Sequence, residues 1–590
     1  METYLSKVEH YSKVFNQTSK RYNSISLLRL LSIFFCLFML FYYIKTNEIG
    51  YAITAFLSFA GFLFLMRIHS KLSFKRELTK AVLKINEDEI FYLKREKLPF
   101  ENGIEFNDFH HPYAYDLDIF GEHSLFQNLN RTAVFIGKKT LADKLLSLSS
   151  NEIILENQEA INELKRKIDW RQDFEALAIV STDSKSSYDS LIHWISFKNK
   201  PLSKVLISFS IILPALFFGF VITYFITSKA ILLSYATYVF IFNLIVLGRS
   251  FKRIQSEIAK ADNIDKTIKH YSLLVQKIEL EKFESKKLIA LQKQLVSKNV
   301  SASSHLKQLS ELFSRMDTIS NLVTAIVFNG SFLFNLHVLK ALLKWKDDYA
   351  HELENWINII GEFEALNSLA NLAFNNADFV FPEINSEYKI GFENLGHPLL
   401  NPVTRVGNDT HFYPESFMIL TGSNMSGKST FLRSLGINMV LGGIGSVVCA
   451  SKANIHPLPV LVSMRLSDSL ADSESYFFAE IKRLKQIMDA LDESPAFVLL
   501  DEILRGTNSD DKRNGTIEVV KKVIAKKAIG AIATHDIEVC LTTNEYPETL
   551  TNQCFEVEIK NNELHFDYKL RSGICKNKSA TFLMQKMGVI

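Results

Sequence analysis

Four long apolar stretches interrupt an otherwise mixed pattern of hydrophobic and polar residues. The first two cover about 30–44 and 49–66, with only a short polar connection between them. The other two cover about 205–226 and 230–247, again with a very short connection. Each stretch of the first pair is close to the minimum of about 17 residues that a transmembrane helix needs. The pattern therefore predicts two transmembrane hairpins, which make four spans in all.

A signal peptide and buried core helices are the other interpretations of these stretches. The first stretch is not typical of a signal peptide, because mostly polar residues precede it and Tyr42, Tyr43 and Lys45 lie at its end. Buried core helices are the alternative for the second pair. Lysine and arginine flank both ends of each pair, and such residues stay on the cytoplasmic side. We therefore expect a multi-pass protein of the cell (inner) membrane whose soluble parts all face the cytoplasm.

The rest of the sequence changes character near residue 383. Before it, apolar residues recur at helical spacing, and one long charged helix is predicted over about 251–298 as a packing helix, lever or coiled-coil arm. After it, short β-like runs and glycine-bearing turns predict an α/β domain. The expected organisation is an N-terminal segment with the first hairpin (1–68), a linker (69–114), a helical domain interrupted by the second hairpin at about 205–247 (115–384), and the α/β domain (385–590).

Composition excludes several classes of protein. Of the 590 residues, 47% are hydrophobic and 22% are charged, which excludes a disordered chain. The net charge is only +3, so any contact with DNA must come from a local patch. The five cysteines show no C-x-x-C spacing, which argues against a disulfide framework or a zinc site.

A glycine-rich loop follows a buried-strand pattern at 417–420 and precedes a helix-like run at 431–440. This context makes the G-x-x-x-x-G-K-S motif a specific signal for a nucleoside triphosphate site. Glycines let backbone N–H groups approach phosphates, Lys428 can reach the β and γ oxygens, and the Ser429 hydroxyl can bind Mg²⁺. The candidate ATP-binding residues are Gly422, Ser423, Asn424, Met425, Ser426, Gly427, Lys428, Ser429 and Thr430.

Two more strand patterns end in polar residues. The run 496–500 leads to Asp501, a candidate Mg²⁺ ligand, and to Glu502, which can orient or deprotonate an attacking water. The run 528–534 leads to His535, which can contact the γ-phosphate. A lone histidine is more often structural, but this set predicts a catalytic role for Glu502 and His535.

These motifs resemble those of the MutS mismatch-repair ATPases. The resemblance rests on T-G-S-N-M-S-G-K-S-T at 421–430, L-D-E-I-L-R-G-T at 500–507 and A-T-H at 533–535. Upstream, segments 118–132, 156–164 and 364–373 and the pair His397–Pro398 look like parts of the same family, so the likeness covers about 115–590. ABC transporter ATPases share the general plan, but their L-S-G-G-Q signature is missing.

The resemblance implies an α-helical core and lever domain followed by an ABC-type P-loop ATPase domain. It also implies ATP and Mg²⁺ as cofactors, and a dimer with two composite sites. Segment 468–480 looks like the stretch that reaches the nucleotide of the opposite subunit, which makes Ser475 an ATP contact in trans, although Tyr476 replaces the usual threonine. The aromatic residue expected to stack on adenine just before Asn408 is missing.

Two further departures concern DNA. A membrane hairpin and a short linker stand where the family has its mismatch-reading module, and the second hairpin falls where the family has a DNA clamp. The leading hypothesis is a membrane-anchored ATPase that forms a homodimer and couples ATP hydrolysis to binding of mismatched or structured double-stranded DNA. Lysines of the lever region could contact phosphates or form a solvated face: Lys260, Lys266, Lys269, Lys286, Lys287, Lys293 and Lys298.

The alternative is an ATP-driven membrane scaffold or remodelling protein that acts on a protein or lipid without DNA. Loss of the mismatch-reading module and of a recognisable clamp favours it, whereas retention of the core domain favours DNA. A transporter subunit has less support, because the apolar stretches carry little polar lining apart from Asn243.

Overall fold

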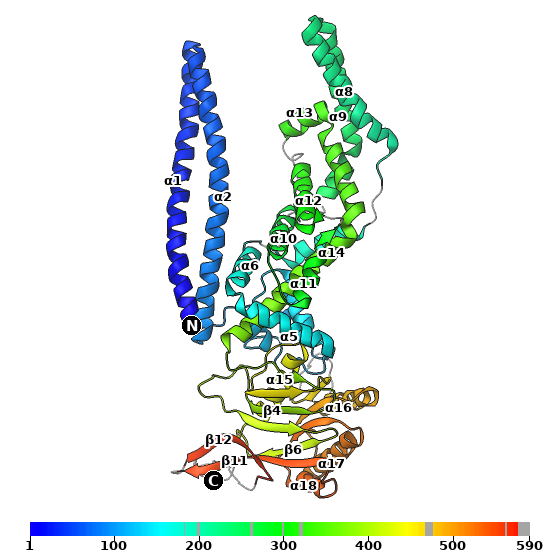
Figure 1. Cartoon of the computed structure of the whole chain (residues 1–590). Helices are drawn as coiled ribbons and strands as arrows, with labels where there is room; N and C mark the ends of the chain where they lie inside the picture. Colours follow the sequence, from blue (N-terminus) through cyan, green and yellow to red (C-terminus); the bar gives the residue numbers. More distant parts are fainter. Residues whose placement is uncertain are drawn as a thin grey trace.

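The computed structural model describes residues 1–181, 183–197, 201–259, 264–297, 300–317, 322–465, 476–560 and 563–575. It confirms a largely helical N-terminal region followed by a mixed α/β region. Figure 1 shows the α/β region at one end, the helical core above it, and two helical hairpins that extend from the core away from the α/β region. The tips of the two hairpins lie on the same side of the molecule.

The first hairpin consists of α1 (Glu2–Thr46) and α2 (Ile49–Leu93), joined at Asn47, whose backbone is left-handed. Helix α2 extends well beyond its apolar part, through the first half of the range expected to be a linker. Its lower half is held because Ala81, Val82 and Ile85 pack on Ala176 of α6 (Ile168–Val180). The foot of the hairpin is therefore part of the helical core.

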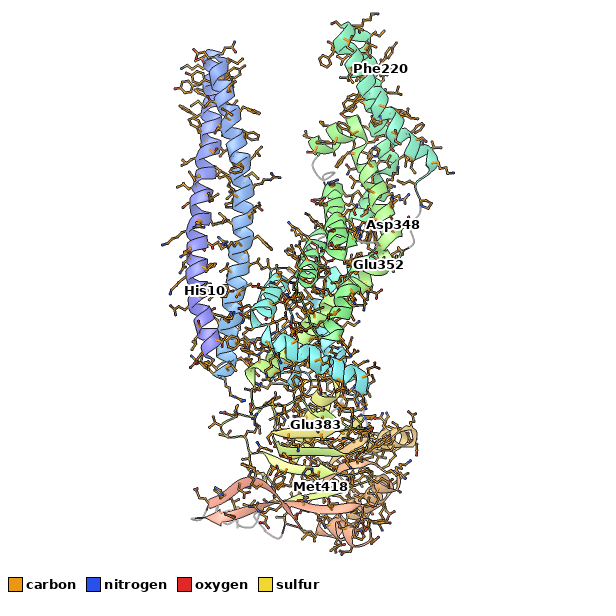
Figure 2. All side chains as sticks on the ribbon, in the orientation of Figure 1. His10, Phe220, Asp348, Glu352, Glu383 and Met418 are labelled. Atoms are coloured by element: carbon orange, nitrogen blue, oxygen red, sulfur yellow. The ribbon has the colours of Figure 1, made fainter. Side chains whose placement is uncertain are left out.

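The second hairpin consists of α8 (Lys204–Thr227) and α9 (Ala230–Ala259). Within the described residues, α1, α2, α8 and residues 230–249 of α9 are long and apolar enough to cross a membrane. Most apolar side chains in these segments are exposed, and Figure 2 shows them projecting outward around Phe220 near the tip of α8. A sharply bent pair, α13 and α14, also passes this test when its two helices are taken together.

The helical core is built around α14, a single helix from Phe334 to Asn375. Near its lower end the carboxylate of Glu364 accepts hydrogen bonds from the backbone N–H groups of Ala133 and Val134 (3.0 and 3.1 Å) at the start of α4. The other elements are η1 (Ile104–Phe106), α3 (Leu125–Leu129), α4 (Phe135–Leu146), α5 (Asn151–Arg166), α7 (Lys185–Ser196), α10 (Ile264–Glu279), α11 (Lys286–Lys293), β1 (Val296–Ser297), β2 (Val300–Ser301), α12 (Ala302–Met316) and α13 (Leu322–Phe332).

The prediction of one long helix over 251–298 is wrong. The chain leaves the helical path between α10 and α11, where the ring of Phe283 is buried and lies 5.4 Å from that of Trp170. The carboxylate of Glu163 accepts hydrogen bonds from the N–H groups of Glu284 and Ser285, which lie just before the first residue of α11. Tertiary contacts therefore end the helix without a glycine or proline.

The α/β region contains two sheets. The larger has the strand order β12-β11-β6-β10-β9-β8, with β11, β6, β10, β9 and β8 parallel and β12 antiparallel at the edge. The smaller has the order β3-β7-β4-β5. The strands are β3 (Glu383–Ile384), β4 (Ile390–Leu395), β5 (Asn408–Phe412), β6 (Phe417–Gly422), β7 (Lys452–Ile455), β8 (Val460–Ser463), β9 (Phe497–Asp501), β10 (Ile529–Ala533), β11 (Leu550–Lys560) and β12 (Glu563–Ser572).

The remaining elements flank these strands. They are α15 (Lys428–Gly443), α16 (Tyr476–Glu493), α17 (Ser509–Ala525), α18 (Ile537–Leu541) and η3 (Thr542–Asn544). The central strands β6, β9 and β10 are buried along their whole length, which explains their continuous apolar sequences. Because these strands are parallel, the polar residues that follow them meet at one edge of the sheet.

Candidate nucleotide site

The glycine loop connects β6 to α15 at this edge. Gly427 has φ +104°, a conformation that favours glycine, and a side chain there would lie 3.1 Å from the ring of Tyr568. At Gly422 an added Cβ would lie 2.6 Å from the Ser426 hydroxyl and 2.9 Å from the Phe555 carbonyl. The loop therefore turns tightly, and its last residues start α15 with free backbone N–H groups, which suits an anion.

Lys428 lies on the inner side of the loop. Its Nζ donates hydrogen bonds to the carbonyls of Gly422 (2.9 Å) and Ser423 (3.1 Å) and lies 3.3 Å from Nε2 of His535. Burial lowers the pKa of Lys428 from its usual value. Asn424, Met425 and Thr430 are exposed on the outer side of the loop. The structure thus places the loop's cation inward, where a bound phosphate would replace the two carbonyls as its partner.

Several oxygens around the loop fit a metal–phosphate group. The Ser429 hydroxyl donates a hydrogen bond of 2.6 Å to Oδ2 of Asp501, while Oδ1 of Asp501 is buried without a partner in the described part of the chain. The hydroxyls of Ser423 and Ser426 are also buried and unpaired there. Burial raises the pKa of Asp501. Buried polar atoms without partners are costly, so these positions suit Mg²⁺ and phosphate oxygens.

Glu502 and His535 lie against each other at the ends of β9 and β10. Oε1 of Glu502 is 2.5 Å from Nε2 of His535, and this hydrogen bond is the main cause that lowers the pKa of Glu502 to about 2. Glu502 also has φ +49°, an uncommon backbone conformation for this residue. The structure brings together Lys428, Asp501, Glu502 and His535, as the sequence suggested.

Two side chains support Glu502 that the sequence did not single out. Arg505 donates a hydrogen bond from Nε to the carbonyl of Glu502 (3.0 Å), and its guanidinium lies 3.5 Å from the Glu502 carboxylate. Glu480 on α16 accepts the backbone N–H of Arg505 at 3.0 Å. Both residues lie within the motifs, but their partners are visible only in the fold. We assign them to positioning the turn that carries Glu502.

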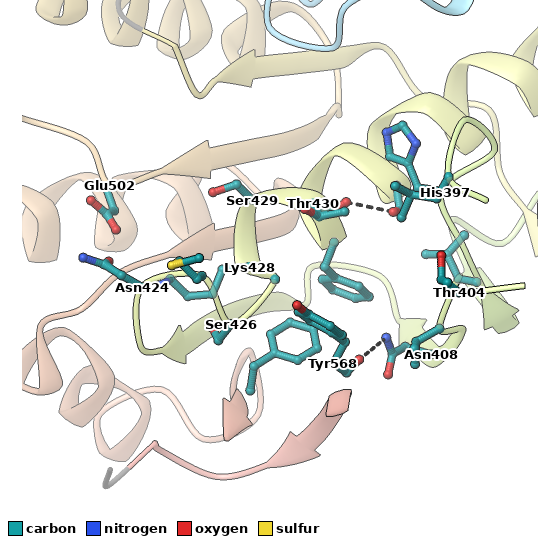
Figure 3. A pocket seen from close by; sticks show the side chains of 18 residues that line it. His397, Thr404, Asn408, Asn424, Ser426, Lys428, Ser429, Thr430, Glu502 and Tyr568 are labelled. Atoms are coloured by element: carbon teal, nitrogen blue, oxygen red, sulfur yellow. Dashed lines mark hydrogen bonds between the residues drawn. The ribbon is translucent and has the colours of Figure 1, made fainter. Parts of the chain in front are cut away.

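A cavity of about 570 Å³ opens beside the loop. Figure 3 shows Tyr568 on one side of it and His397 and Thr404 on the other. Tyr568 on β12 is an aromatic side chain at this cavity, and its strand is tied to Asn408, because Asn408 Nδ2 donates to the Tyr568 carbonyl (3.0 Å) and Asn408 Oδ1 accepts from Leu570 N–H (2.8 Å). Burial lowers the pKa of His397 to about 4, so its ring is neutral at pH 7.

The remaining predicted contacts are that of Ser475 with ATP in trans and those of the lever lysines with DNA. Ser475 lies outside the described residues, so the predicted contact in trans stays a prediction. Among the lever lysines, Lys266, Lys269, Lys286 and Lys293 are exposed, and Lys260 and Lys298 fall outside the described part. Lys287 is not free for DNA, because its Nζ lies 2.7 Å from the Glu362 carboxylate and donates a hydrogen bond to Asn157 (2.6 Å).

The core domain contacts the α/β region next to this site. Asp116 accepts hydrogen bonds from the backbone N–H groups of Met464 and Arg465, both at 2.8 Å. The side chain of Arg465 in turn pairs with the carboxylate of Asp118. Burial raises the pKa of Asp116. These contacts tie the chain just after β8 to the helical core.

Comparison with known proteins also relates the α/β region to the MutS ATPases. Residues 418–588 match the family model of MutS domain V. The chain is 35% identical over 194 residues to the DNA mismatch repair protein MutS of Clostridium perfringens, which covers 30% of this chain and 21% of that protein. It is 27% identical over 339 residues to MutS of Aquifex pyrophilus, covering 53% and 38%.

A human relative, MutS protein homolog 4, is 29% identical over 244 residues, covering 39% of this chain and 25% of that protein. The chain therefore matches well under half the length of these curated relatives. Its C-terminal region is an ATPase domain of the MutS domain V type, with distant homology to MutS proteins over part of the remaining chain. The match implies that this region binds and hydrolyses ATP with Mg²⁺.

Proposed function

We propose that this protein is a membrane-anchored ATPase that hydrolyses ATP at composite sites of a homodimer and couples hydrolysis to its helical core. The observation that carries the proposal is the arrangement at the strand ends, where Lys428, the Ser429–Asp501 pair and the Glu502–His535 pair face one loop. The unpaired buried oxygens of Ser423, Ser426 and Asp501 support a Mg–ATP complex as the ligand.

Each residue has a role in this proposal. Lys428 and the loop N–H groups hold the phosphates, and Ser429 and Asp501 would hold Mg²⁺, which neutralises charge that develops between the β- and γ-phosphates. Glu502 with a pKa near 2 is ionised at neutral pH and is a weak base, so it is better suited to orient a water by accepting its hydrogen bond than to remove a proton from it. His535 holds the Glu502 carboxylate in place, and Ser475 of a second copy would complete the site.

Membrane anchoring is supported by exposed apolar surface. Phe225 and Ile226 near the tip of α8 are 78% and 77% exposed, and Phe56 on α2 is 71% exposed. Soluble monomers seldom expose contiguous apolar patches of this extent. In both hairpins the basic flanking segments lie at the end nearer the core, and the connection between the two helices lies at the far tip. This arrangement agrees with a chain that enters the membrane from the cytoplasmic side and returns to it.

We further propose double-stranded DNA as the ligand to which ATP hydrolysis is coupled. Support comes from the relatives, whose names describe DNA mismatch repair proteins, and from the exposed lysines Lys266, Lys269, Lys286 and Lys293. The second candidate is an ATP-driven scaffold that acts on a membrane partner. The observation that favours it is α14, which joins the core beside the ATPase region to the second hairpin in one unbroken helix.

The test of the ATPase uses two site variants and one control. Lys428→Ala should lose productive ATP binding, whereas Glu502→Ala should bind ATP but hydrolyse it at least about 100-fold more slowly. Glu493→Ala, at the exposed end of α16, is the matched control and should behave as the unmodified protein. Normal turnover in Glu502→Ala would refute the assignment of that carboxylate.

The test of DNA coupling uses the detergent-solubilised Glu502→Ala protein with Mg-ATP. Linear, mismatched and branched duplexes are titrated across a salt series. Binding that requires ATP and weakens steeply with salt would support DNA as the ligand, because phosphate contacts release counterions. Absence of binding at low salt, with nucleotide shown to be bound, would leave the membrane scaffold as the better proposal.

A further inference from the structure

Helix α13 and the start of α14 form an apolar corner that the hydropathy pattern of the sequence did not reveal. Residues 318–339 contain no aspartate, glutamate, lysine or arginine. Helix α13 meets α14 at an angle of 80°, and the bend lies at Leu333, whose φ is +50°. On α13 the side chains of Val323, Val327 and Phe332 are 72%, 51% and 47% exposed. A short helix without acidic or basic residues thus turns an apolar face outward.

This corner packs against the apolar parts of the second hairpin. The Phe332 ring lies 4.8 Å from that of Phe218 on α8, and Asn243 on α9 donates a hydrogen bond of 2.7 Å to the Gly330 carbonyl. A Cβ at Gly330 would come within 2.2 Å of the Phe240 ring, so only glycine permits this approach.

The depth of the corner follows from helix geometry. At 1.5 Å per residue, Phe218 lies about 21 Å along α8 from Lys204, and Asn243 lies about 9 Å along α9 from Arg249. Lys204 and Arg249 mark the basic end of the hairpin. The hydrocarbon core of a bilayer is about 30 Å thick. The contacts of the corner therefore lie about 9 to 21 Å along the helices from the basic end, which is within the thickness of the hydrocarbon core.

The corner enters and leaves on the same side of the hairpin. Helix α12 before it packs on α10 and α14, and α14 after it continues into the core. Helix α13 has 11 residues, about 16 Å, which is too short to cross a bilayer. The first charged residue after the bend is the exposed Lys340, about 10 Å further along α14, where it can reach the lipid–water boundary.

At a bend inside the hydrocarbon core, the backbone N–H and C=O groups need hydrogen-bond partners within the protein, because no water is present. Here the Asn329 side chain accepts the backbone N–H of Asn335 at 2.9 Å and donates to the Asn335 side chain at 3.1 Å. Asn335 in turn donates to the Met316 carbonyl at 3.2 Å. The ring of His337 lies 2.8 Å from the Ser210 carbonyl on α8. Asn329, Asn335 and His337 thus find partners inside the fold, while Val323, Val327 and Phe332 are exposed on the outer face.

We propose that α13 is a re-entrant membrane element, whose outer face contacts the acyl chains of the same bilayer that holds α8 and α9. The inference rests on the proposed anchoring of the second hairpin. Its support is continuity, because the exposed face of α13 extends the apolar surface of α8 and α9 without a charged residue between them. With α13 in the membrane, the continuous helix α14 runs from the membrane interior to the core beside the ATPase region.

The test places a nitroxide label at single cysteines in the full-length protein in liposomes, after replacement of the five native cysteines. Val327→Cys and Val323→Cys report on α13, since positions four apart share one face. Ile241→Cys on α9 reports on the anchoring, and Val296→Cys on β1, 58% exposed, is the aqueous control. Collision rates with oxygen and with a polar nickel chelate are measured, and retained ATP hydrolysis confirms the fold of each variant.

We expect the ratio of oxygen to chelate collisions at both α13 positions to match that at Ile241 and to exceed that at Val296 at least about tenfold. If the α13 positions instead give a collision ratio as low as that at Val296, while Ile241 still gives a high ratio, the re-entrant proposal is overturned and the anchoring stays supported. Spin–spin broadening at Val327 would show a second copy on this face and also overturn it. Free access of the chelate to Ile241 would refute the anchoring itself.

Discussion

The foot of the first hairpin is held by a buried ion pair, and removal of one partner should release it. Glu89 on α2 is 2% exposed and Arg131 is 6% exposed. Nε of Arg131 donates to Oε1 of Glu89, and the side-chain amides of Asn371 and Asn375 on α14 donate to the two Glu89 oxygens at 2.8 and 2.9 Å. One carboxylate thus joins α2 to both the core and α14.

Glu89→Gln keeps the shape of the side chain and removes its charge. Loss of one member of a buried pair costs about 3–5 kcal/mol, because the other charge stays buried without a partner. The glutamine keeps one acceptor oxygen, and Arg131 keeps its position over the Phe100 ring, 3.4 Å from the centroid. We therefore expect the lower end of this range, about 3 kcal/mol, which raises the fraction of molecules with an open hairpin foot about 100-fold.

Hydrogen exchange followed by mass spectrometry measures this opening directly. Amides of the lower half of α2 should exchange about 100-fold faster in Glu89→Gln than in the unmodified protein, and those of β6 and β9 should be unchanged. Glu9→Gln removes the exposed pair of Glu9 with Lys13 on α1 and is the control, for which we expect no measurable change. The double variant Glu89→Gln/Arg131→Met should exchange more slowly than Glu89→Gln alone, because the unpaired charge is gone. Exchange within about threefold of the unmodified protein in Glu89→Gln would contradict the argument.

Two further predictions concern the nucleotide cavity and the core. Tyr568→Ala should raise KM for ATP about fivefold with little change in kcat, because loss of aromatic stacking costs on the order of 1 kcal/mol. Tyr413→Ala, which removes an aromatic side chain that is 63% exposed elsewhere, is the control, and an unchanged KM in Tyr568→Ala would exclude base stacking. Burial raises the pKa of Glu364 to about 8, so the folded state keeps this proton while the unfolded chain loses it above about pH 4.5, and stability falls as pH rises between these values. Glu364→Gln should therefore flatten the decrease of Tm between pH 5 and pH 8, and an unchanged slope would show that Glu364 does not cause it.

The nucleotide loop could be predicted from the sequence because its information is local. The strand before the loop, the glycines and the helix after it follow one another directly, and parallel strands bring Asp501, Glu502 and His535 to the same edge. Tyr568 could not be found this way. It reaches the cavity through the pairing of β11 with β12 and through Asn408, which is 160 residues earlier in the chain.

In the helical region, the hydrophobic pattern of the sequence does not predict every helix boundary. The break between α10 and α11 depends on Glu163 and Trp170, which lie more than 100 residues earlier in the sequence, and no glycine or proline marks it. The apolar helix α13 was missed because its 11 residues are shorter than any spanning segment. Its bend at Leu333 is stabilised by asparagine side chains whose partners are set by the fold.

The common direction of the two hairpins limits how two copies can meet. Both tips lie on one side of the molecule and the ATPase region lies at the other end, so copies anchored as proposed above would all stand the same way up in the bilayer. A symmetric dimer of such copies has its two-fold axis along the membrane normal, because any other axis would turn one copy upside down. Copies then find each other by lateral diffusion, and the occupancy of composite sites depends on their density per area of membrane.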